Sequence, residues 1–192
     1  GFSDVVVGNE TKYGDTVRGV SVYYGGPAGL PATAGWTWTG VSTSGHIKGT
    51  TAGDVNGDGY ADVLVLDEQS ATLFYGSAAG LTNVAAWSVA VQGGFNDPGD
   101  VGTAGDVNGD GYADVVVGSQ LESTARLYYG SPTGLASVAD WTTTGSAGYG
   151  STVGAAGDVN GDGLTDLVVT ADSAAHVYYG GLAGLSSGAP DW

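Results

Sequence analysis

The sequence predicts an all-β fold built of tandem units, and three observations support this prediction. Glycine supplies 37 of the 192 residues, which favours frequent turns over long helices. The octapeptide Ala-Gly-Asp-Val-Asn-Gly-Asp-Gly occurs at residues 52–59, 104–111 and 156–163, with a period of 52 residues. A run of Val and Leu follows each octapeptide, which is typical of a buried strand.

The apolar runs are predicted to be strands covered on both faces. They occupy residues 63–66, 115–117 and 167–169, and residues 5–7 form the same run in the first unit. These runs are apolar at every position rather than at every second one, as expected where small sheets stack face against face.

Aromatic residues mark the next two strands of each unit. One strand ends in an aromatic pair followed by Gly, in four copies at residues 22–25, 73–76, 127–130 and 177–180. A Gly-Leu turn follows, and a Trp then opens another short strand. Because these residues recur in every unit, we interpret them as packing residues between units rather than as sugar-binding platforms. They are Tyr24, Tyr75, Tyr129, Tyr179, Trp36, Trp87, Trp141 and Trp192.

With the segment that leads into each Asp-rich loop, a unit holds four strands, which is the content of a β-propeller blade. We predict a single repeat domain of about four antiparallel, four-stranded blades, at approximately residues 1–44, 45–96, 97–148 and 149–192. The first blade lacks its innermost strand, and the last has a truncated outermost strand. Because such ends leave sheet edges unpaired, we expect a homo-oligomer or association with further blades.

Each complete loop carries the pattern Asp-x-Asn-x-Asp-Gly-x-x-Asp. Calcium takes 6–8 oxygen ligands, which the side chains at positions 1, 3, 5 and 9 and the carbonyl at position 7 are suited to supply. We therefore predict three Ca²⁺ sites. Their ligands are Asp54, Asn56, Asp58, Tyr60, Asp62; Asp106, Asn108, Asp110, Tyr112, Asp114; and Asp158, Asn160, Asp162, Leu164, Asp166.

Two other interpretations of the loops are weaker. An EF-hand needs a bidentate Glu at position 12 and a helix on either side, whereas position 12 here is Val65, Val117 or Val169. Asp, Asn and Gly also favour simple turns. Turn formation alone does not explain why three Asp residues occur within nine residues in each of three loops. Their negative charges repel one another, and a bound cation would offset this repulsion.

The Asp-rich loop, the Val-rich strand and the Tyr-Tyr-Gly strand together resemble the FG-GAP repeats of integrin-α propellers and of many exported bacterial proteins. The resemblance covers essentially the whole chain. It implies that the loop lies between the first and second strands of a blade and binds calcium. Tyr149-Gly150 best matches the Phe-Gly element of the family. Asp4 matches position 9 of a fourth loop, where no complete site is expected.

Charge and composition argue against several classes of function. Twenty acidic residues against four Lys and Arg give a net charge of −16, which disfavours nucleic acid and anionic membrane surfaces as partners. No apolar run approaches the roughly 20 residues that membrane insertion needs. The chain has no Cys for a disulfide, a thiolate zinc site or a nucleophile. We find no cluster of acid, base and nucleophile outside the repeats, and therefore expect that the protein is not an enzyme.

We expect an extracellular or cell-surface scaffold that presents loops to a protein or glycan partner, as in cell adhesion. The alternatives are a structural propeller fragment that self-associates to complete a ring, and a lectin. Trp38 is the candidate ligand contact, because it occurs outside the repeat. The long loop at 8–19 is either a binding insertion or a longer hairpin. We expect His46 and His176 to be exposed, and the remaining Asp residues to serve solubility. These are Asp15, Asp67, Asp97, Asp100, Asp140, Asp172 and Asp191.

Overall fold

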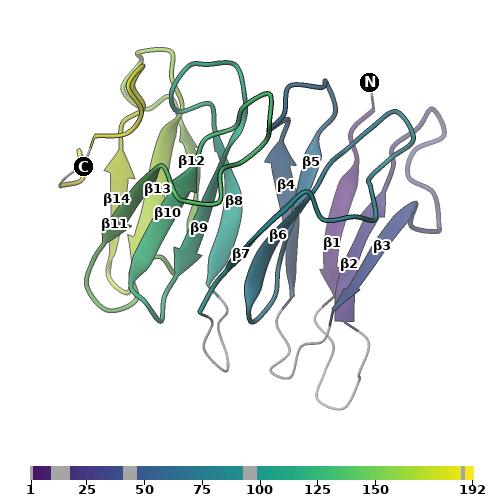
Figure 1. Cartoon of the computed structure of the whole chain (residues 1–192), viewed down its shortest axis with the longest axis horizontal. Coiled ribbons are helices and arrows are strands. Elements are labelled where there is room, and N and C mark those ends of the chain that lie inside the picture. Colours follow the sequence, from purple (N-terminus) through teal and green to yellow (C-terminus); the bar gives the residue numbers. More distant parts are fainter. Residues whose placement is uncertain (1, 10–17, 41–46, 93–98, 187–188) are drawn as a thin grey trace.

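The computed structural model of the chain describes residues 2–9, 18–40, 47–92, 99–186 and 189–192. These residues form fourteen β-strands and no helix, which confirms the all-β prediction (Figure 1). The strands form four antiparallel sheets of three or four strands, as blades of a propeller do, and the sheets do not close into a ring. Within each sheet, strands that are consecutive in the chain are neighbours.

The strands of the four sheets have the following bounds. The first sheet contains β1 (Val5–Asn9), β2 (Arg18–Tyr23) and β3 (Trp36–Gly40). The second contains β4 (Lys48–Gly53), β5 (Asp62–Leu66), β6 (Ser70–Phe74) and β7 (Trp87–Ala90). The third contains β8 (Asp100–Gly105), β9 (Asp114–Ser119), β10 (Thr124–Tyr128) and β11 (Trp141–Thr144). The fourth contains β12 (Val153–Gly157), β13 (Asp166–Ala171) and β14 (Ala174–Tyr178).

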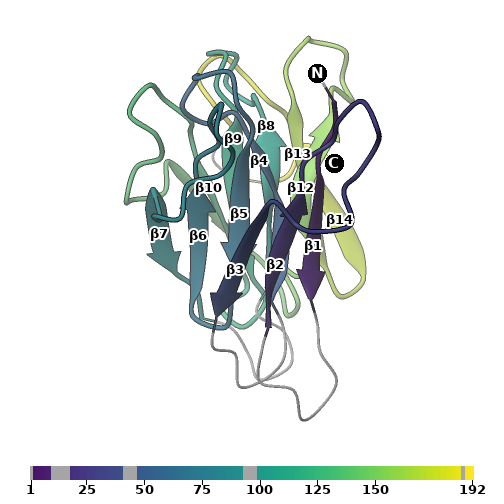
Figure 2. The ribbon, with the colours of Figure 1, turned by 90° about the vertical axis from the view of Figure 1, so that its right-hand side faces the viewer.

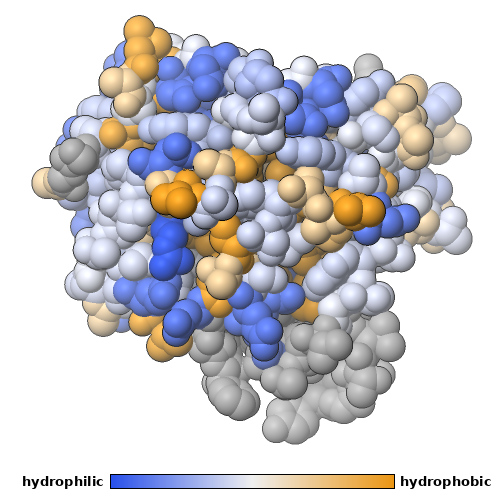
Figure 3. All heavy atoms as spheres, viewed as in Figure 1, coloured by the Kyte–Doolittle hydropathy of each residue, from blue (hydrophilic) through white to orange (hydrophobic). Residues whose placement is uncertain are grey.

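The sheets stand side by side in chain order. The first sheet lies at the right of Figure 1 and the fourth at the left, and Figure 2 views the row from the end at which the first sheet lies. The strands β4, β8 and β12 contact one another in turn, and β1 lies beside β4. On the surface seen in Figure 3, hydrophobic residues form small groups among hydrophilic ones.

The hydrophobic core lies between the sheets. Every residue of β5 and β9 is buried, as predicted for strands that are covered on both faces. The same prediction for residues 5–7 is wrong, because Val5 and Val7 of β1 are exposed on a side that no other sheet of the described residues covers. Each of three hydrophobic clusters draws residues from two neighbouring sheets. The cluster between the second and third sheets, for example, contains Leu64 and Leu73 from one side and Val115 and Tyr128 from the other.

The repeated Trp residues join one sheet to the next. The ring of Trp87 lies 4.8 Å from that of Tyr128, and its Nε1 donates a hydrogen bond of 2.7 Å to the carbonyl of Ala136. Trp36 and Trp141 make the same two contacts with the sheets that follow them. This confirms the predicted packing between units for Trp36, Trp87 and Trp141, whereas Trp192 is exposed, contrary to the prediction.

In the first three units, the Tyr at the second position of the aromatic pair also reaches the following sheet. The Tyr24 hydroxyl accepts a hydrogen bond of 2.7 Å from the Leu81 N–H, and the Tyr129 hydroxyl accepts one of 3.3 Å from the Leu185 N–H. A Cβ atom on Gly134 would lie 1.9 Å from the Tyr75 hydroxyl, and Gly134 has φ 84°. Glycine is therefore required in this turn both for its conformation and for the approach of the tyrosine.

The predicted exposure of His176 is wrong, and Trp38, the candidate ligand contact, is also partly covered. Trp38 is half-buried and packs against the cluster between the first and second sheets. His176 is half-buried too, with its ring 5.5 Å from that of Tyr149. Neither burial follows from the repeat, because each depends on a neighbour that the repeat does not specify. His46, Asp15, Asp97 and residues 10–17 of the long loop lie outside the described residues.

Asp100 is not a solubility charge, contrary to the prediction. Its carboxylate is buried, accepts hydrogen bonds of 2.8 Å from the Val101 N–H and 3.0 Å from the Val153 N–H, and pairs with Lys48. Asp100 thus connects the first strands of the second, third and fourth sheets. The equivalent positions hold Lys48 and Thr152, so the repeat pattern gave no sign of this role.

Trp87→Ala is expected to lower the free energy of unfolding by about 3–5 kcal/mol, because it removes a buried ring and leaves a cavity. Urea unfolding measures the change. Val84→Ala is the matched control, since Val84 is exposed and its truncation should change stability by less than about 0.5 kcal/mol. Equal effects of the two substitutions would contradict the inter-sheet role of Trp87.

Asp100→Ala is expected to destabilise the fold by about 1–3 kcal/mol, because it leaves buried N–H groups without an acceptor. Lys48→Ala separates the contribution of the ion pair, which should be below about 1 kcal/mol because the lysine is half exposed. Urea unfolding of both variants tests this. A loss from Lys48→Ala as large as that from Asp100→Ala would show that the ion pair, and not the backbone contacts, dominates.

Candidate metal-binding loops

The three Asp-rich loops occupy equivalent places in the fold. They connect β4 to β5, β8 to β9, and β12 to β13, so each lies between the first and second strands of its sheet. Position 9 of each loop is the first residue of the second strand. The loops turn tightly through glycines in the left-handed region, such as Gly57 with φ 74° and Gly59 with φ 87°.

The Asp at position 1 organises the loop backbone. Oδ1 of Asp54 accepts hydrogen bonds from the N–H groups of Gly57 (2.7 Å) and Asp58 (3.1 Å), and Oδ2 accepts one of 2.8 Å from Gly59. Asp106 and Asp158 accept the equivalent three bonds in their loops. The loop backbone is therefore folded around this first carboxylate.

Positions 3 and 5 contact each other on the exposed side of the loop. Oδ1 of Asn56 accepts a bond of 3.0 Å from the Asp58 N–H, and its Nδ2 donates one of 3.2 Å to Oδ2 of Asp58. Oδ1 of Asp58 in turn accepts a bond of 2.9 Å from the Tyr60 N–H. Both other loops repeat this arrangement.

The Asp at position 9 has a structural role that the spacing did not reveal. Asp62 is fully buried, and its two oxygens accept hydrogen bonds from the N–H groups of Val55 (3.0 Å) and Gly76 (2.9 Å). Asp114 and Asp166 make the equivalent pairs of bonds. Each carboxylate thereby ties its loop to the glycine that follows the aromatic pair. The recurrence of this Asp and this Gly in all four units was the available signal.

The first unit retains one half of this arrangement. Asp4 is exposed, and its Oδ1 accepts a hydrogen bond of 2.7 Å from the Gly25 N–H. This is the counterpart of the bond between Asp62 and Gly76. The link from the carboxylate to the glycine after the aromatic pair therefore recurs in all four sheets.

The position 9 carboxylates lie in a setting that suits a cation. The pKa of Asp62 is raised to about 6 and the pKa of Asp114 to about 7, chiefly by burial; the backbone hydrogen bonds lower both values, and the charges of the Asp residues at positions 5 and 1 add to the rise. The ion pairs between described residues are Lys48–Asp100 and Arg126–Glu122, and neither includes a loop carboxylate. A positive charge in the loop would relieve this repulsion.

The donor chemistry of each loop fits a hard cation. Asp at positions 1, 5 and 9, Asn at position 3 and the carbonyl at position 7 offer only oxygen ligands, which calcium prefers. In the described part of the chain, no three Asp, Glu, His or Cys side chains are already grouped as a metal cluster. A carboxylate oxygen that accepts one N–H retains a second lone pair. Each carboxylate can therefore still bind a cation while it keeps these hydrogen bonds.

The family comparison agrees with this architecture. The model of the FG-GAP-like repeat matches residues 54–117 and 106–169 in tandem. The chain belongs to the FG-GAP-like repeat family. Both matches begin at position 1 of an Asp-rich loop and run through the buried strand of the next repeat. No curated protein matches the chain.

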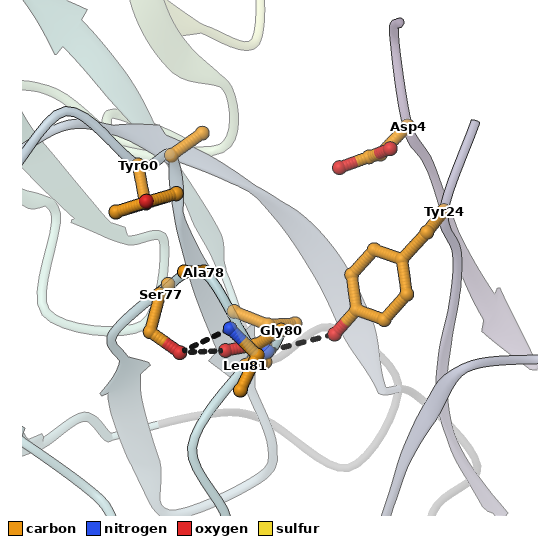
Figure 4. Close-up of a pocket in the computed structure, with 10 residues that line it drawn as sticks. Asp4, Tyr24, Tyr60, Ser77, Ala78, Gly80 and Leu81 are labelled. Carbon is orange, nitrogen blue, oxygen red and sulfur yellow. Dashed lines mark hydrogen bonds between the residues drawn. The ribbon is translucent and has the colours of Figure 1, made fainter. Parts of the chain in front are cut away.

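A pocket lies between the first and second FG-GAP-like repeats, with a volume of about 330 Å³ (Figure 4). Asp4, Tyr24, Tyr60 and Ser77 contribute polar atoms to its lining. At the next junction, Val55 is buried, and its carbonyl accepts a hydrogen bond of 3.0 Å from the Ser131 N–H. None of the described segments is a helix that could cross a membrane.

Proposed function

We propose that this FG-GAP-like chain is a calcium-stabilised, propeller-like scaffold. The observation that carries the proposal is that three equivalent loops each combine side-chain oxygen atoms at positions 1, 3 and 5 with a buried position 9 carboxylate that has no cationic side chain among its described partners. Repetition at equivalent places in three sheets argues for one shared ligand. Calcium fits because the donors are oxygen alone.

Within each loop, some residues would bind the cation with side-chain oxygens and one with its backbone carbonyl. Positions 1, 3, 5 and 9 would hold the cation with side-chain oxygens, and Tyr60, Tyr112 or Leu164 would offer a backbone carbonyl. Calcium would supply two positive charges where carboxylates repel one another. The chain's own contribution is the backbone network around position 1 and the bonds that anchor position 9 to the third strand.

We propose further that the scaffold is a non-catalytic binding module that acts outside the cell or at its surface. Loops of this kind are suited to the millimolar calcium found there. The pocket between the first two repeats favours recognition of a polar ligand such as a glycan, because it combines the exposed aromatic ring of Tyr60 with the carboxylate of Asp4 and the hydroxyl of Ser77.

Calcium is expected to raise the melting temperature of chelated protein. If each loop has a Kd of about 10⁻⁴ M, about 1 mM calcium stabilises each site by about 1.4 kcal/mol. Three sites together would raise the melting temperature by about 10 °C. Thermal unfolding during a calcium titration measures this, and an unchanged melting temperature would contradict the proposal.

Asp110→Ala tests the assignment to one loop. Asp110 is exposed, so in EDTA the variant should unfold close to the wild-type temperature, while the rise on adding calcium should shrink by about a third. Asp172→Ala removes the same charge outside the loops and serves as the control. An equal calcium response in both variants would show that this loop holds no ion.

Tyr60→Ala tests the pocket as the ligand site. The side chain of Tyr60 lines the pocket, whereas only its carbonyl is assigned to the metal. On a glycan array, sugars retained by the wild type should be lost by the variant, and its melting temperature in calcium should change little. Retention of the same sugars by both proteins would show that this pocket does not bind them.

A further inference from the structure

Each of the three loops contains an Asn-Gly pair at positions 3 and 4. The pairs are Asn56-Gly57, Asn108-Gly109 and Asn160-Gly161. In such a pair, the backbone nitrogen of the glycine can attack the side-chain carbonyl carbon of the asparagine, because the glycine has no Cβ atom to hinder the approach. Each loop therefore holds a site at which the chain can modify itself without an enzyme.

The modification is a deamidation that consumes water and needs neither an oxidant nor a reductant. The glycine nitrogen loses its proton and forms a bond to the asparagine carbonyl carbon, and the asparagine amide nitrogen leaves as ammonia with that proton. The resulting succinimide takes up one water molecule and opens at either of its two carbonyl carbons. One product has aspartate at position 3, and the other has isoaspartate, which adds one carbon to the backbone of the loop.

The fold requires glycine at position 4 of the loop. Gly57 has φ 74°, and a Cβ atom on it would lie 2.5 Å from Cε1 of Tyr112 in the next loop. Gly109 has φ 74° as well, and a Cβ atom on it would lie 2.8 Å from Cδ2 of Leu164. A side chain at either position would strain the backbone and collide with the next loop, so the fold retains the reactive glycine.

The loop also uses the amide of the asparagine. Nδ2 of Asn56 donates a hydrogen bond of 3.2 Å to Oδ2 of Asp58, and Oδ1 of Asn56 accepts one of 3.0 Å from the Asp58 N–H. An aspartate at position 3 would replace the donated bond by repulsion between two carboxylates. Both members of the reactive pair are therefore required by the local structure.

The carboxylate at position 1 holds the nitrogen that would attack. The Gly57 N–H donates a hydrogen bond of 2.7 Å to Oδ1 of Asp54, and the Gly109 N–H donates one of 2.7 Å to Oδ1 of Asp106. The third loop has the equivalent bond. The nitrogen must give up this bonded proton before it attacks, and the adjacent negative charge opposes the negative charge that develops on the nitrogen. Position 1 thus opposes the reaction.

We propose that Asn56, Asn108 and Asn160 are sites of self-deamidation, and that the position 1 carboxylate of each loop suppresses the reaction in the folded protein. Opening of a loop would release the glycine N–H and the asparagine side chain together. Because hydrolysis of the succinimide also gives isoaspartate, a loop that opens would be altered permanently. This inference goes beyond the proposed function and does not rest on calcium.

Incubation of the full chain at mildly alkaline pH in EDTA tests the proposal, because EDTA removes any contribution of a bound metal. Peptide mass spectrometry measures deamidation at each asparagine, and the same chain unfolded in urea gives the unprotected rate. In the folded protein, Asn56 and Asn108 should deamidate at least about tenfold more slowly, as expected where a hydrogen bond to a charged group must break before the attack. Equal rates in buffer and in urea would overturn the proposal.

Asp54→Ala separates the effect of the carboxylate from the general protection that folding gives. The variant should raise the deamidation rate at Asn56 by about tenfold and leave the rate at Asn108 unchanged, so the second loop is an internal control. Asp106→Ala should give the reverse pattern. Asp172→Ala removes a charge outside the loops and should change neither rate.

Asp54→Asn takes the place of the alanine variant if circular dichroism shows that Asp54→Ala is unfolded. It keeps the shape of the side chain and one oxygen acceptor but removes the charge, so the rate at Asn56 should rise less than in the alanine variant. An unchanged rate at Asn56 in the folded variant, or an equal rise at Asn56 and Asn108, would overturn the role of Asp54. A missing calcium response would affect neither result.

Discussion

The buried carboxylate at position 9 of each loop is the constraint on which the rest of the structure depends. It begins the second strand of its sheet, holds the N–H at loop position 2, and holds the N–H of the glycine that follows the aromatic pair. One side chain thereby fixes the loop, the strand that follows it and the aromatic strand relative to one another. Replacing such an acceptor would leave two buried N–H groups unsatisfied in every sheet where it occurs.

This fixed geometry also determines how neighbouring sheets contact one another. The glycine held by Asp62 or Asp114 comes directly after the aromatic pair, so the carboxylate also positions the two rings that contact neighbouring sheets. The first ring receives the Trp of the preceding sheet, and the second reaches the Gly-Leu turn of the following one. Loop chemistry and inter-sheet packing are thus coupled through the backbone of one strand, which is why a cation in the loops is expected to stabilise the whole row.

Much of this architecture could be predicted, because residues that serve the same structural role recur at equivalent positions of the repeat. The all-β fold, the buried Val-rich strands and the packing of Trp87 and its equivalents all followed from the repeat. Features outside the repeat could not be predicted. Asp100 bridges three strands from a position that holds Lys or Thr in the neighbouring units, and the burial of Trp38 and His176 depends on tertiary neighbours. The spacing gave the oxygen chemistry of the loops, but not the hydrogen bond from Asp62 to a glycine 14 residues away.

We propose that each loop brings its oxygen ligands around a divalent cation while the position 9 carboxylate keeps its hydrogen bonds to the backbone. A crystal structure of the full chain grown in about 1 mM calcium tests this most directly. The account predicts three anomalous density peaks, each bounded by the side chains at positions 1, 3, 5 and 9 and by the carbonyl at position 7. Loops that contain no peak, and retain only the hydrogen bonds among their own groups, would contradict it.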